Sequence, residues 1–330
     1  MPVPSPQRSD IGRLPAYSGA TVPAFDRLPA HKRVWRDTAV QARLPGLWKL
    51  ARVKRALVAA ILTAVLAGCT SSNAPPAEGA RPRIVSLIPS LTEDLCAIGA
   101  AKQLVGVSQF GSGIACAKGL PEVNDASSVD AEKIVALHPG LVVGIPSQAR
   151  AVSALQRAGL KVSLLRDDTY TDLFGDITKL GSLSGHQSEA SALISRLRER
   201  TKELQASEHF ARRPAVFVVL QTNPIWTVGP GSYISSLISL AGGRNVVTAL
   251  PQTYAQFSGE ALLRLQPDAL LAARDAQLEQ SVSREPWRSL LAVRAKRLLI
   301  VPNPDLLYRP GPRYNEALSW LIERLRPIAR

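Results

Sequence analysis

The hydrophobic pattern of the chain contains one helix–strand unit twice. The first copy, residues 132–143, reads EKIVALHPGLVV, and the second, residues 260–271, reads EALLRLQPDALL. Each copy starts with a glutamate, continues as a short apolar helix and reaches a proline, which cannot continue a helix. The apolar run after each proline is typical of a buried strand. The two copies predict two similar α/β lobes, although so generic a unit can also recur by chance.

Strands and helices alternate along the chain from residue 82 onward. Outside the repeat, the apolar runs that predict strands are 83–87, 104–107, 162–165, 215–220 and 297–301. Helical patterns are found at 149–158, 233–240, around 285–291 and at 314–326. Such alternation predicts parallel sheets with helices on both faces, and hence an α/β fold with two doubly wound lobes.

The longest helical pattern lies between the two copies, at 188–208. Its apolar face recurs at spacings of three and four, and its other face is charged. The positions on the apolar face are Ala190, Leu193, Ile194, Leu197, Thr201 and Leu204. A helix of this length spans roughly 30 Å, the width of a small domain. We therefore predict a first lobe at 82–185, one connecting backbone helix at 186–210 and a second lobe at 211–330.

The first helix of the first lobe is expected to open at Pro89. Ser90 suits the N-cap position, and Glu93 follows at the spacing of a capping box. We interpret Glu93 as structural for this reason. The loop 108–123, after the next strand, is long and rich in small residues, which makes it a candidate part of a binding site.

A short apolar segment lies well inside the chain. The pair Lys54-Arg55 precedes 12 largely apolar residues at 56–67, and Leu-Ala-Gly-Cys closes the segment at Cys69. Twelve residues are too few to cross a bilayer as a helix, but they fit a secretory signal. Leu-Ala-Gly-Cys resembles the lipobox of bacterial lipoproteins, which implies a signal peptide at 53–69 and lipidation of Cys69. A buried helix that contains a cysteine is the alternative.

The segments on either side of this signal have different compositions. Residues 1–52 are rich in Pro and Arg without a hydrophobic period, so we expect them to be disordered, or not made if translation starts at Val53. Residues 70–81 have the composition of a flexible linker. We expect an exported protein, in the periplasm or at the cell surface, that is held to the membrane by its lipid anchor.

Two cysteines remain after export, Cys96 and Cys116. An oxidising compartment allows them to form a disulfide. Two unpaired, buried thiols are the alternative, and spacing alone does not decide between them.

The net charge of +14 is concentrated at the N-terminus. Residues 1–68 hold 11 Lys/Arg and 3 Asp/Glu, a net of +8, which leaves +6 spread thinly over the remainder. No basic patch with interleaved aromatics is found, so we do not expect nucleic-acid binding. We find no GxSxG, HExxH or P-loop motif. Of the four histidines, His31 lies in the segment 1–52 and His138 suits a helix end before Pro139, which leaves too few for a zinc or manganese cage. An exported lipoprotein enzyme is the rival function class, but no nucleophile–base pair can be named for it.

Four segments in this order carry a family resemblance: 83–93 (RIVSLIPSLTE), 104–107 (LVGV), 132–143 and 309–313 (RPGPR). Together they resemble the substrate-binding proteins of bacterial ABC importers for cobalamin, ferric siderophores and haem. The resemblance covers about residues 82–328. It implies two α/β lobes joined by one long helix, a monomer that captures a metal chelate without catalysis, and no cofactor or protein-bound metal.

The resemblance also assigns roles to the repeat. Glu132 and Glu260 match the two glutamates, one per lobe, that dock onto arginines of the dimeric membrane permease. Such rim charges mainly contribute orientation and association rate. The alternative is that both only complement the dipoles of their helices.

The resemblance places the ligand between the lobes. The matching positions are Phe110, Trp226, Tyr254, Asp305, Tyr308 and Arg309. Flat aromatic walls suit a large planar chelate, and Arg309 could meet a carboxylate or amide rim. Ala126 stands where the cobalamin-binding members have a Trp, and the loop 111–116 lacks their Asp-Tyr-Pro pattern. The cobalamin-binding members still give the best match that we can trace, so cobalamin is the leading ligand despite these departures, with a siderophore or haem as alternatives.

Overall fold

The computed structural model describes residues 81–330, apart from positions 126, 207–209 and 251. The expected signal peptide, nearly all of the expected linker and the lipidation site Cys69 lie outside the described residues, as does Ala126. Within the described part of the chain, no helix is long and apolar enough to cross a membrane.

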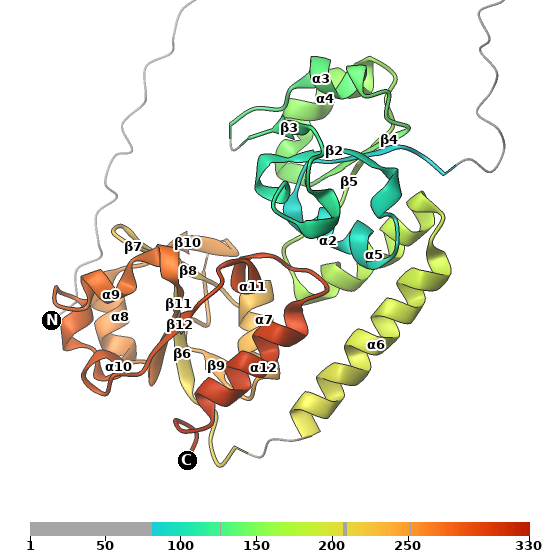
Figure 1. Ribbon diagram of the computed structural model, residues 1–330. Helices are drawn as coiled ribbons and strands as arrows, with labels where there is room; N and C mark the ends of the chain where they lie inside the picture. Colours follow the sequence, from blue (N-terminus) through green and yellow to red (C-terminus); the bar gives the residue numbers. More distant parts are fainter. Residues whose placement is uncertain (1–80, 126, 207–209, 251) are drawn as a thin grey trace, which may run out of the picture. The chain divides into compact units, whose positions relative to one another are not determined.

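The first lobe is built on a five-stranded parallel sheet in the order β3-β2-β1-β4-β5 (Figure 1). All residues of its central strands β1 and β4 are buried, as expected for a parallel sheet covered on both faces. The strands are β1 (Ile84–Ser86), β2 (Leu104–Ser108), β3 (Glu122–Asn124), β4 (Leu141–Gly144) and β5 (Val162–Leu164). The helices are α2 (Pro89–Ala97), α3 (Ala131–Ala136), α4 (Ala149–Arg157) and α5 (Tyr170–Ser184).

The second lobe has a four-stranded parallel sheet in the order β12-β11-β6-β9 and a small antiparallel sheet in the order β10-β8-β7. The antiparallel sheet was not predicted, and neither were the short parallel edge strands β9 and β3, the second of which begins within the predicted loop 108–123. The strands are β6 (Ala215–Val219), β7 (Gln221–Thr222), β8 (Ile225–Val228), β9 (Arg244–Asn245), β10 (Tyr254–Gln256), β11 (Ala269–Ala273) and β12 (Leu298–Val301). The helices are α7 (Tyr233–Leu240), α8 (Gly259–Leu265), α9 (Leu278–Ser281), α10 (Leu291–Arg294), α11 (Asp305–Tyr308) and α12 (Tyr314–Leu325).

The long helix α6 (Gln187–Ala206) connects the lobes and contacts α5 of the first lobe and α12 of the second (Figure 1). Its predicted apolar face is buried, except that Ile194 is only half-buried. The hydroxyl of Tyr314 on α12 hydrogen-bonds to Thr201 and donates to the carbonyl of Leu197, at 3.0 Å for the latter. One continuous apolar cluster extends from the first lobe through α6 to α12, so the connecting helix belongs to the core of both lobes.

The repeat is confirmed as a structural unit. The first copy forms α3 and β4, and the second forms α8 and β11. The residue before each proline has a left-handed backbone, with φ of 46° at His138 and 41° at Gln266. A left-handed residue is a common way to end a helix, and it turns the chain from helix to strand in the same way twice.

Helix α5 was missed by the sequence patterns, although its ends carry clear signals. Thr169 Oγ1 accepts from the backbone N of Asp172, and an Asp172 carboxylate oxygen accepts from the backbone N of Thr169, both at 3.0 Å. Gly185 ends the helix with φ of 76°. This pair is a reciprocal capping arrangement with Asp in place of the usual Glu or Gln, and it places a 15-residue helix against α6.

Two local predictions were wrong. Ser90 is not the N-cap of α2, which begins at Pro89 after Ile88, and its hydroxyl instead donates to Asp167 Oδ2 at 2.6 Å. The expected helix around 285–291 is a 3₁₀ turn at Trp287–Ser289 followed by the short α10. Trp287 and Leu290 are both buried, and their spacing of three residues suits the 3₁₀ turn.

The sulfurs of Cys96 and Cys116 form a disulfide, with Cα atoms 6.3 Å apart. Cys96 lies on α2 and Cys116 in the loop between β2 and β3. The bond therefore ties this long loop to the first helix of the lobe.

Candidate functional site

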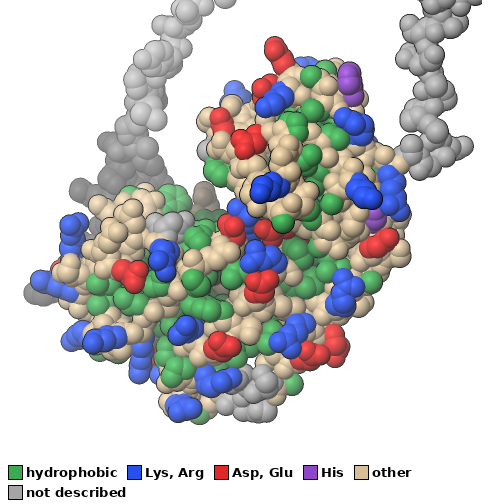
Figure 2. Space-filling view, viewed as in Figure 1, with side chains coloured by type: hydrophobic (Ala, Val, Ile, Leu, Met, Phe, Trp, Pro, Cys, Tyr) green, Lys and Arg blue, Asp and Glu red, His purple; other side chains and the backbone are tan. Residues whose placement is uncertain are grey.

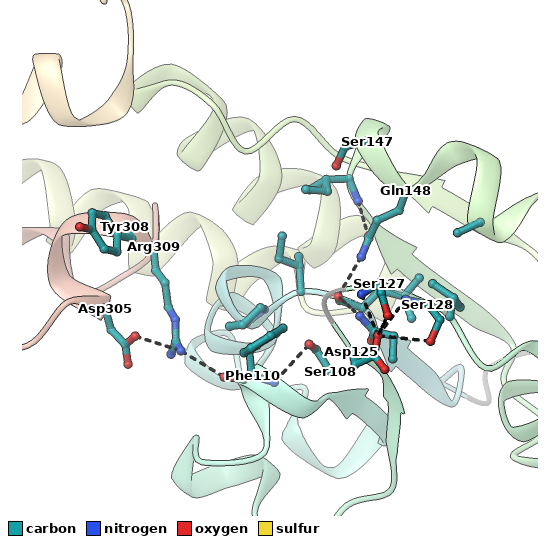
Figure 3. Close-up of a pocket in the computed structure, with 17 residues that line it drawn as sticks. Ser108, Phe110, Asp125, Ser127, Ser128, Ser147, Gln148, Asp305, Tyr308 and Arg309 are labelled. Carbon is teal, nitrogen blue, oxygen red and sulfur yellow. Dashed lines mark hydrogen bonds and ion pairs between the residues drawn. The ribbon is translucent and has the colours of Figure 1, made fainter. Parts of the chain in front are cut away.

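A cleft of about 610 Å³ opens where the parallel strands of the first lobe end, and α11 of the second lobe forms its opposite side (Figure 3). Open α/β sheets bind ligands outside the carboxyl ends of their strands, so the position of this cleft is that of a binding site. Its lining residues are Leu87, Ile88, Pro89, Ser108, Phe110, Asn124, Asp125, Ser127, Ser128, Val129, Ile145, Ser147, Gln148, Ala151, Asp305, Tyr308 and Arg309.

Four of the six predicted ligand residues line this cleft: Phe110, Asp305, Tyr308 and Arg309. Trp226 and Tyr254 do not line it. They lie on the neighbouring strands β8 and β10, where Trp226 pairs with Gln256. Burial raises the pKa of the Tyr254 hydroxyl to about 12, and the carboxylates of Asp168 and Asp167 add to this rise.

Phe110 is the aromatic side chain best placed to meet a ligand. It is 50% exposed, although it lies in a cleft. Its backbone N donates to Ser108 Oγ at 3.3 Å, in a short 3₁₀ turn directly after β2. A half-exposed ring held by its backbone is a ready surface for stacking on a flat ligand.

Arg309 joins the two lobes at the edge of the cleft. Its Nη1 lies 3.3 Å from Glu93 Oε1, and its Nη2 lies 3.0 Å from Asp305 Oδ1 and 3.1 Å from the Phe110 carbonyl oxygen. Figure 2 shows acidic and basic side chains next to one another where the first lobe meets the second. Burial raises the pKa of the Glu93 carboxyl, and the hydrogen bond from Arg309 opposes that rise. Glu93 therefore contributes to the contact between the lobes, a role that was missed when it was interpreted as a helix-capping residue.

The other wall of the cleft carries a compact turn that sequence reasoning did not assign. Asp125 Oδ1 accepts from the backbone N of Ser127 and of Ser128 at 2.7 and 2.8 Å, and from their hydroxyls at 2.8 and 3.2 Å. These bonds lower the pKa of Asp125 to about 2. An Asp with serines two and three positions later is a signal for such a turn, but the signal does not reveal that the turn lines a cleft.

Two amide side chains hold this wall in place. Asn124 Nδ2 and Gln148 Nε2 both donate to the Leu87 carbonyl at 3.1 Å, and Gln148 Oε1 accepts from the backbone N of Ile145 at 3.1 Å. Asn124 Oδ1 is buried and has no partner among the described residues. The unpaired Asn124 Oδ1 is enclosed by the protein, so the two amides position the wall and this oxygen is not offered to a ligand.

Three acids of the first lobe lie close to its contact with α7: Asp94 and Asp176 are buried, and Asp167 is half-buried. Burial raises the pKa of Asp167 to about 7 and of Asp176 to about 8, and it holds the pKa of Asp94 well above its usual value. The backbone N of Tyr233 on α7 donates to the Asp168 carbonyl at 2.9 Å, which links the lobes beside these acids. These three carboxyl groups therefore keep their protons up to a higher pH than exposed carboxyl groups do, close to the contact between the lobes.

The two repeat glutamates lie outside the cleft, at equivalent positions. Glu132 and Glu260 are each the second residue of their helix, after the N-caps Asp130 and Ser258. Both are exposed. Glu260 lies 4.0 Å from Arg264 one turn later. Their positions suit both the docking role and the simpler role of complementing the helix dipole. Among the described residues, no group of His, Cys, Asp and Glu is arranged to hold a metal ion.

Comparison with known proteins agrees with this architecture. The chain is 28% identical over 255 residues to the uncharacterized ABC transporter substrate-binding lipoprotein YvrC of Bacillus subtilis, covering 74% of this chain and 80% of the relative. The periplasmic vitamin B12 binding protein BtuF of Vibrio cholerae aligns with a TM-score of 0.67 at 26% identity, covering 75% of this chain and 98% of that one.

A periplasmic heme binding protein from Pseudomonas aeruginosa aligns with a TM-score of 0.64 at 28% identity, covering 76% of this chain and 94% of that one. The resemblance that the sequence motifs suggested is confirmed, as is the two-lobed α/β fold. The model of the periplasmic binding protein family matches residues 84–304. The chain therefore belongs to the periplasmic binding protein family, whose members bind ligands and are not enzymes.

Proposed function

We propose that this protein captures cobalamin or a related metal chelate outside the cytoplasm and delivers it to the permease of an ABC importer. One observation carries the proposal: a cleft of about 610 Å³ lies between the strand ends of one lobe and α11 of the other, with the half-exposed ring of Phe110 in it. That volume and that ring suit one large, flat ligand.

The names of the relatives support the ligand class. One solved relative is described as a vitamin B12 binding protein and another as a heme binding protein. Cobalamin is the first choice, in keeping with the sequence motifs, and haem or a ferric siderophore is the alternative. In this function the metal arrives inside the ligand, and the protein needs no cofactor of its own.

The proposal includes export and anchoring. Signal cleavage before Cys69 and lipidation of that cysteine would hold the receptor at the membrane surface as a monomer, with the following polar residues as a tether. The YvrC relative is described as a lipoprotein, which supports this part. Metabolic labelling with a fatty acid should mark the protein, and Cys69→Ala should abolish the label.

A titration tests the ligand. The full-length protein, purified in detergent, is titrated by calorimetry with cyanocobalamin, haem and ferric hydroxamates. One-to-one binding of one of these chelates is expected. Phe110→Ala should weaken it about tenfold through lost stacking. Leu291→Ala is the matched control, because Leu291 is 52% exposed but lies outside the cleft. Absence of binding to every chelate would refute the proposal.

Docking to the permease needs its own test. Glu132 and Glu260 are exposed at the same position of two equivalent helices, which suits two equivalent subunits of a permease dimer. The double variant Glu132→Ala, Glu260→Ala should bind ligand normally but fail to stimulate ATP hydrolysis by the importer in proteoliposomes. Glu279→Ala, which removes an exposed first-turn glutamate of α9, should stimulate normally. Full stimulation by the double variant would leave both glutamates with only a structural role.

A further inference from the structure

Three charged side chains line the cleft: Asp125, Asp305 and Arg309. Figure 3 shows Asp305 and Arg309 on one side and Asp125 on the other. Both terminal nitrogens of Arg309 are engaged by the protein, through Glu93, Asp305 and the Phe110 carbonyl. Among the described lining residues, the carboxylates outnumber the cation, and that cation is already neutralised. An anionic ligand would therefore gain little from Arg309 and would face Asp125 directly.

Asp125 is a hydrogen-bond acceptor on this wall of the cleft. All four hydrogen bonds from Ser127 and Ser128 end on its Oδ1, so its Oδ2 remains for a ligand. With its pKa lowered to about 2, the carboxylate stays ionised at every physiological pH. A ligand amide or ammonium group can donate to it, whereas a ligand carboxylate is repelled.

We propose that this cleft selects metal chelates that present amide or amine N–H groups and carry no carboxylate, and that Asp125 is the residue that sets this preference. The inference rests on the proposed function and narrows its ligand class. It favours corrinoids with their peripheral amides, or hydroxamate chelates with an amine, over haem with its two propionates.

Matched ligand pairs test the preference without a mutation. The first pair is cyanocobalamin and its three monocarboxylates, in each of which one propionamide of the corrin ring is hydrolysed. The second pair is an amine-ended ferric trihydroxamate and its succinylated form, which ends in a carboxylate. Within each pair the metal and most of the molecular shape stay the same, while an N–H donor group is replaced by a group that ends in a negatively charged carboxylate. For whichever pair binds, the carboxylate form, or at least one of the three monocarboxylates, should bind about tenfold more weakly.

Substitution of Asp125 should then reduce the discrimination. In Asp125→Asn the side-chain oxygen can still accept from Ser127 and Ser128, so the turn is retained while the charge is removed. In this variant the difference in affinity between the amide or amine form and the carboxylate form should shrink to about threefold or less. High salt should also reduce this difference in the unmodified protein, because the exposed Asp125 carboxylate is screened by ions. Glu122→Gln is the control: Glu122 is an exposed acid two residues before the cleft wall and does not line the cleft.

The outcomes are separable. Weaker binding of a carboxylate form that Asp125→Asn relieves and Glu122→Gln does not would support the inference. Equal or tighter binding of the carboxylate forms, or tight binding of haem alone, would overturn it and leave the receptor function intact. Absence of binding to every chelate would overturn the proposed function, and this inference with it. The ligand pairs in the unmodified protein decide the matter even if a variant fails to fold.

Discussion

Neutralising Asp176 should make the stability of the protein less sensitive to pH. Asp176 is 5% exposed, and its Oδ2 has no partner among the described residues. Burial raises its pKa from 3.8 to about 8, and the nearby Asp167 and Asp172 carboxylates contribute. Between pH 3.8 and about pH 8, the folded state therefore keeps a proton that the unfolded state has lost. The stability that this side chain contributes is complete below pH 3.8 and is lost as the pH rises through about 8.

The size of the effect follows from proton linkage. While unfolding releases one proton, the free energy of unfolding falls by about 1.4 kcal/mol per pH unit. Between pH 5 and pH 7 a single such group accounts for about 2.7 kcal/mol. Asn binds no proton in either state, so Asp176→Asn should remove this share. Asp94 and Asp167, whose pKa values are also raised by burial, should keep part of the slope.

Urea unfolding monitored by tryptophan fluorescence, from pH 5 to pH 8 at constant ionic strength, measures this slope. Asp125→Asn is the control. Its pKa is lowered to about 2, so Asp125 is ionised in both states across this range and its loss should leave the slope unchanged. If Asp176→Asn and the unmodified protein fall in parallel from pH 5 to pH 7, Asp176 is ionised in the folded state and the reasoning from burial is wrong.

Two further predictions concern the framework of the first lobe. Cys116→Ser should lower the free energy of unfolding by about 3 kcal/mol, since the disulfide closes a loop with a sequence separation of 20 residues. A reductant should destabilise the unmodified protein by the same amount and leave the variant unchanged. Thermal melts of the unmodified protein that do not respond to reductant would contradict this prediction. Thr169→Ala should lower the free energy of unfolding by about 1 kcal/mol by removing the cap of α5. Thr169→Ser keeps the hydroxyl and should have nearly the same free energy of unfolding as the unmodified protein in urea. Equal losses of stability in both variants would show that the cap is not the cause.

The sequence predicted the fold where the pattern is local and repeated. The repeat unit, the buried face of α6 and the longer parallel strands follow from periodicity and from prolines at helix ends, whereas the short edge strands β3 and β9 were missed. The small antiparallel sheet was not predictable in this way, because β7 has only two residues and its partners are chosen by tertiary contact. Helix α5 was missed although Thr169 and Gly185 mark its ends, since Asp172 is a less familiar partner in a capping box than Glu.

The candidate site was predictable only in part, because side chains that meet in a cleft come from distant segments. Motif resemblance found Phe110, Asp305, Tyr308 and Arg309, and the structure brings these four together. Motif resemblance could not tell that Trp226 and Tyr254 lie on a separate sheet. Nor could it find the Asp125 turn, whose sequence reads as an ordinary surface turn until the fold places it in the wall.

Arg309 shows most clearly why a residue's type does not fix its role. An arginine beside a ligand cleft suggests a site for a carboxylate or amide rim of the ligand, as we expected from the family resemblance. Its terminal nitrogens instead hold Glu93 of the first lobe, Asp305 of its own helix and the Phe110 carbonyl. The same side chain that would have attracted an anion therefore fixes the position of α11 and the backbone of Phe110. With Arg309 engaged in this way, the charge of the cleft is set by its carboxylates, and the ligand class follows from them.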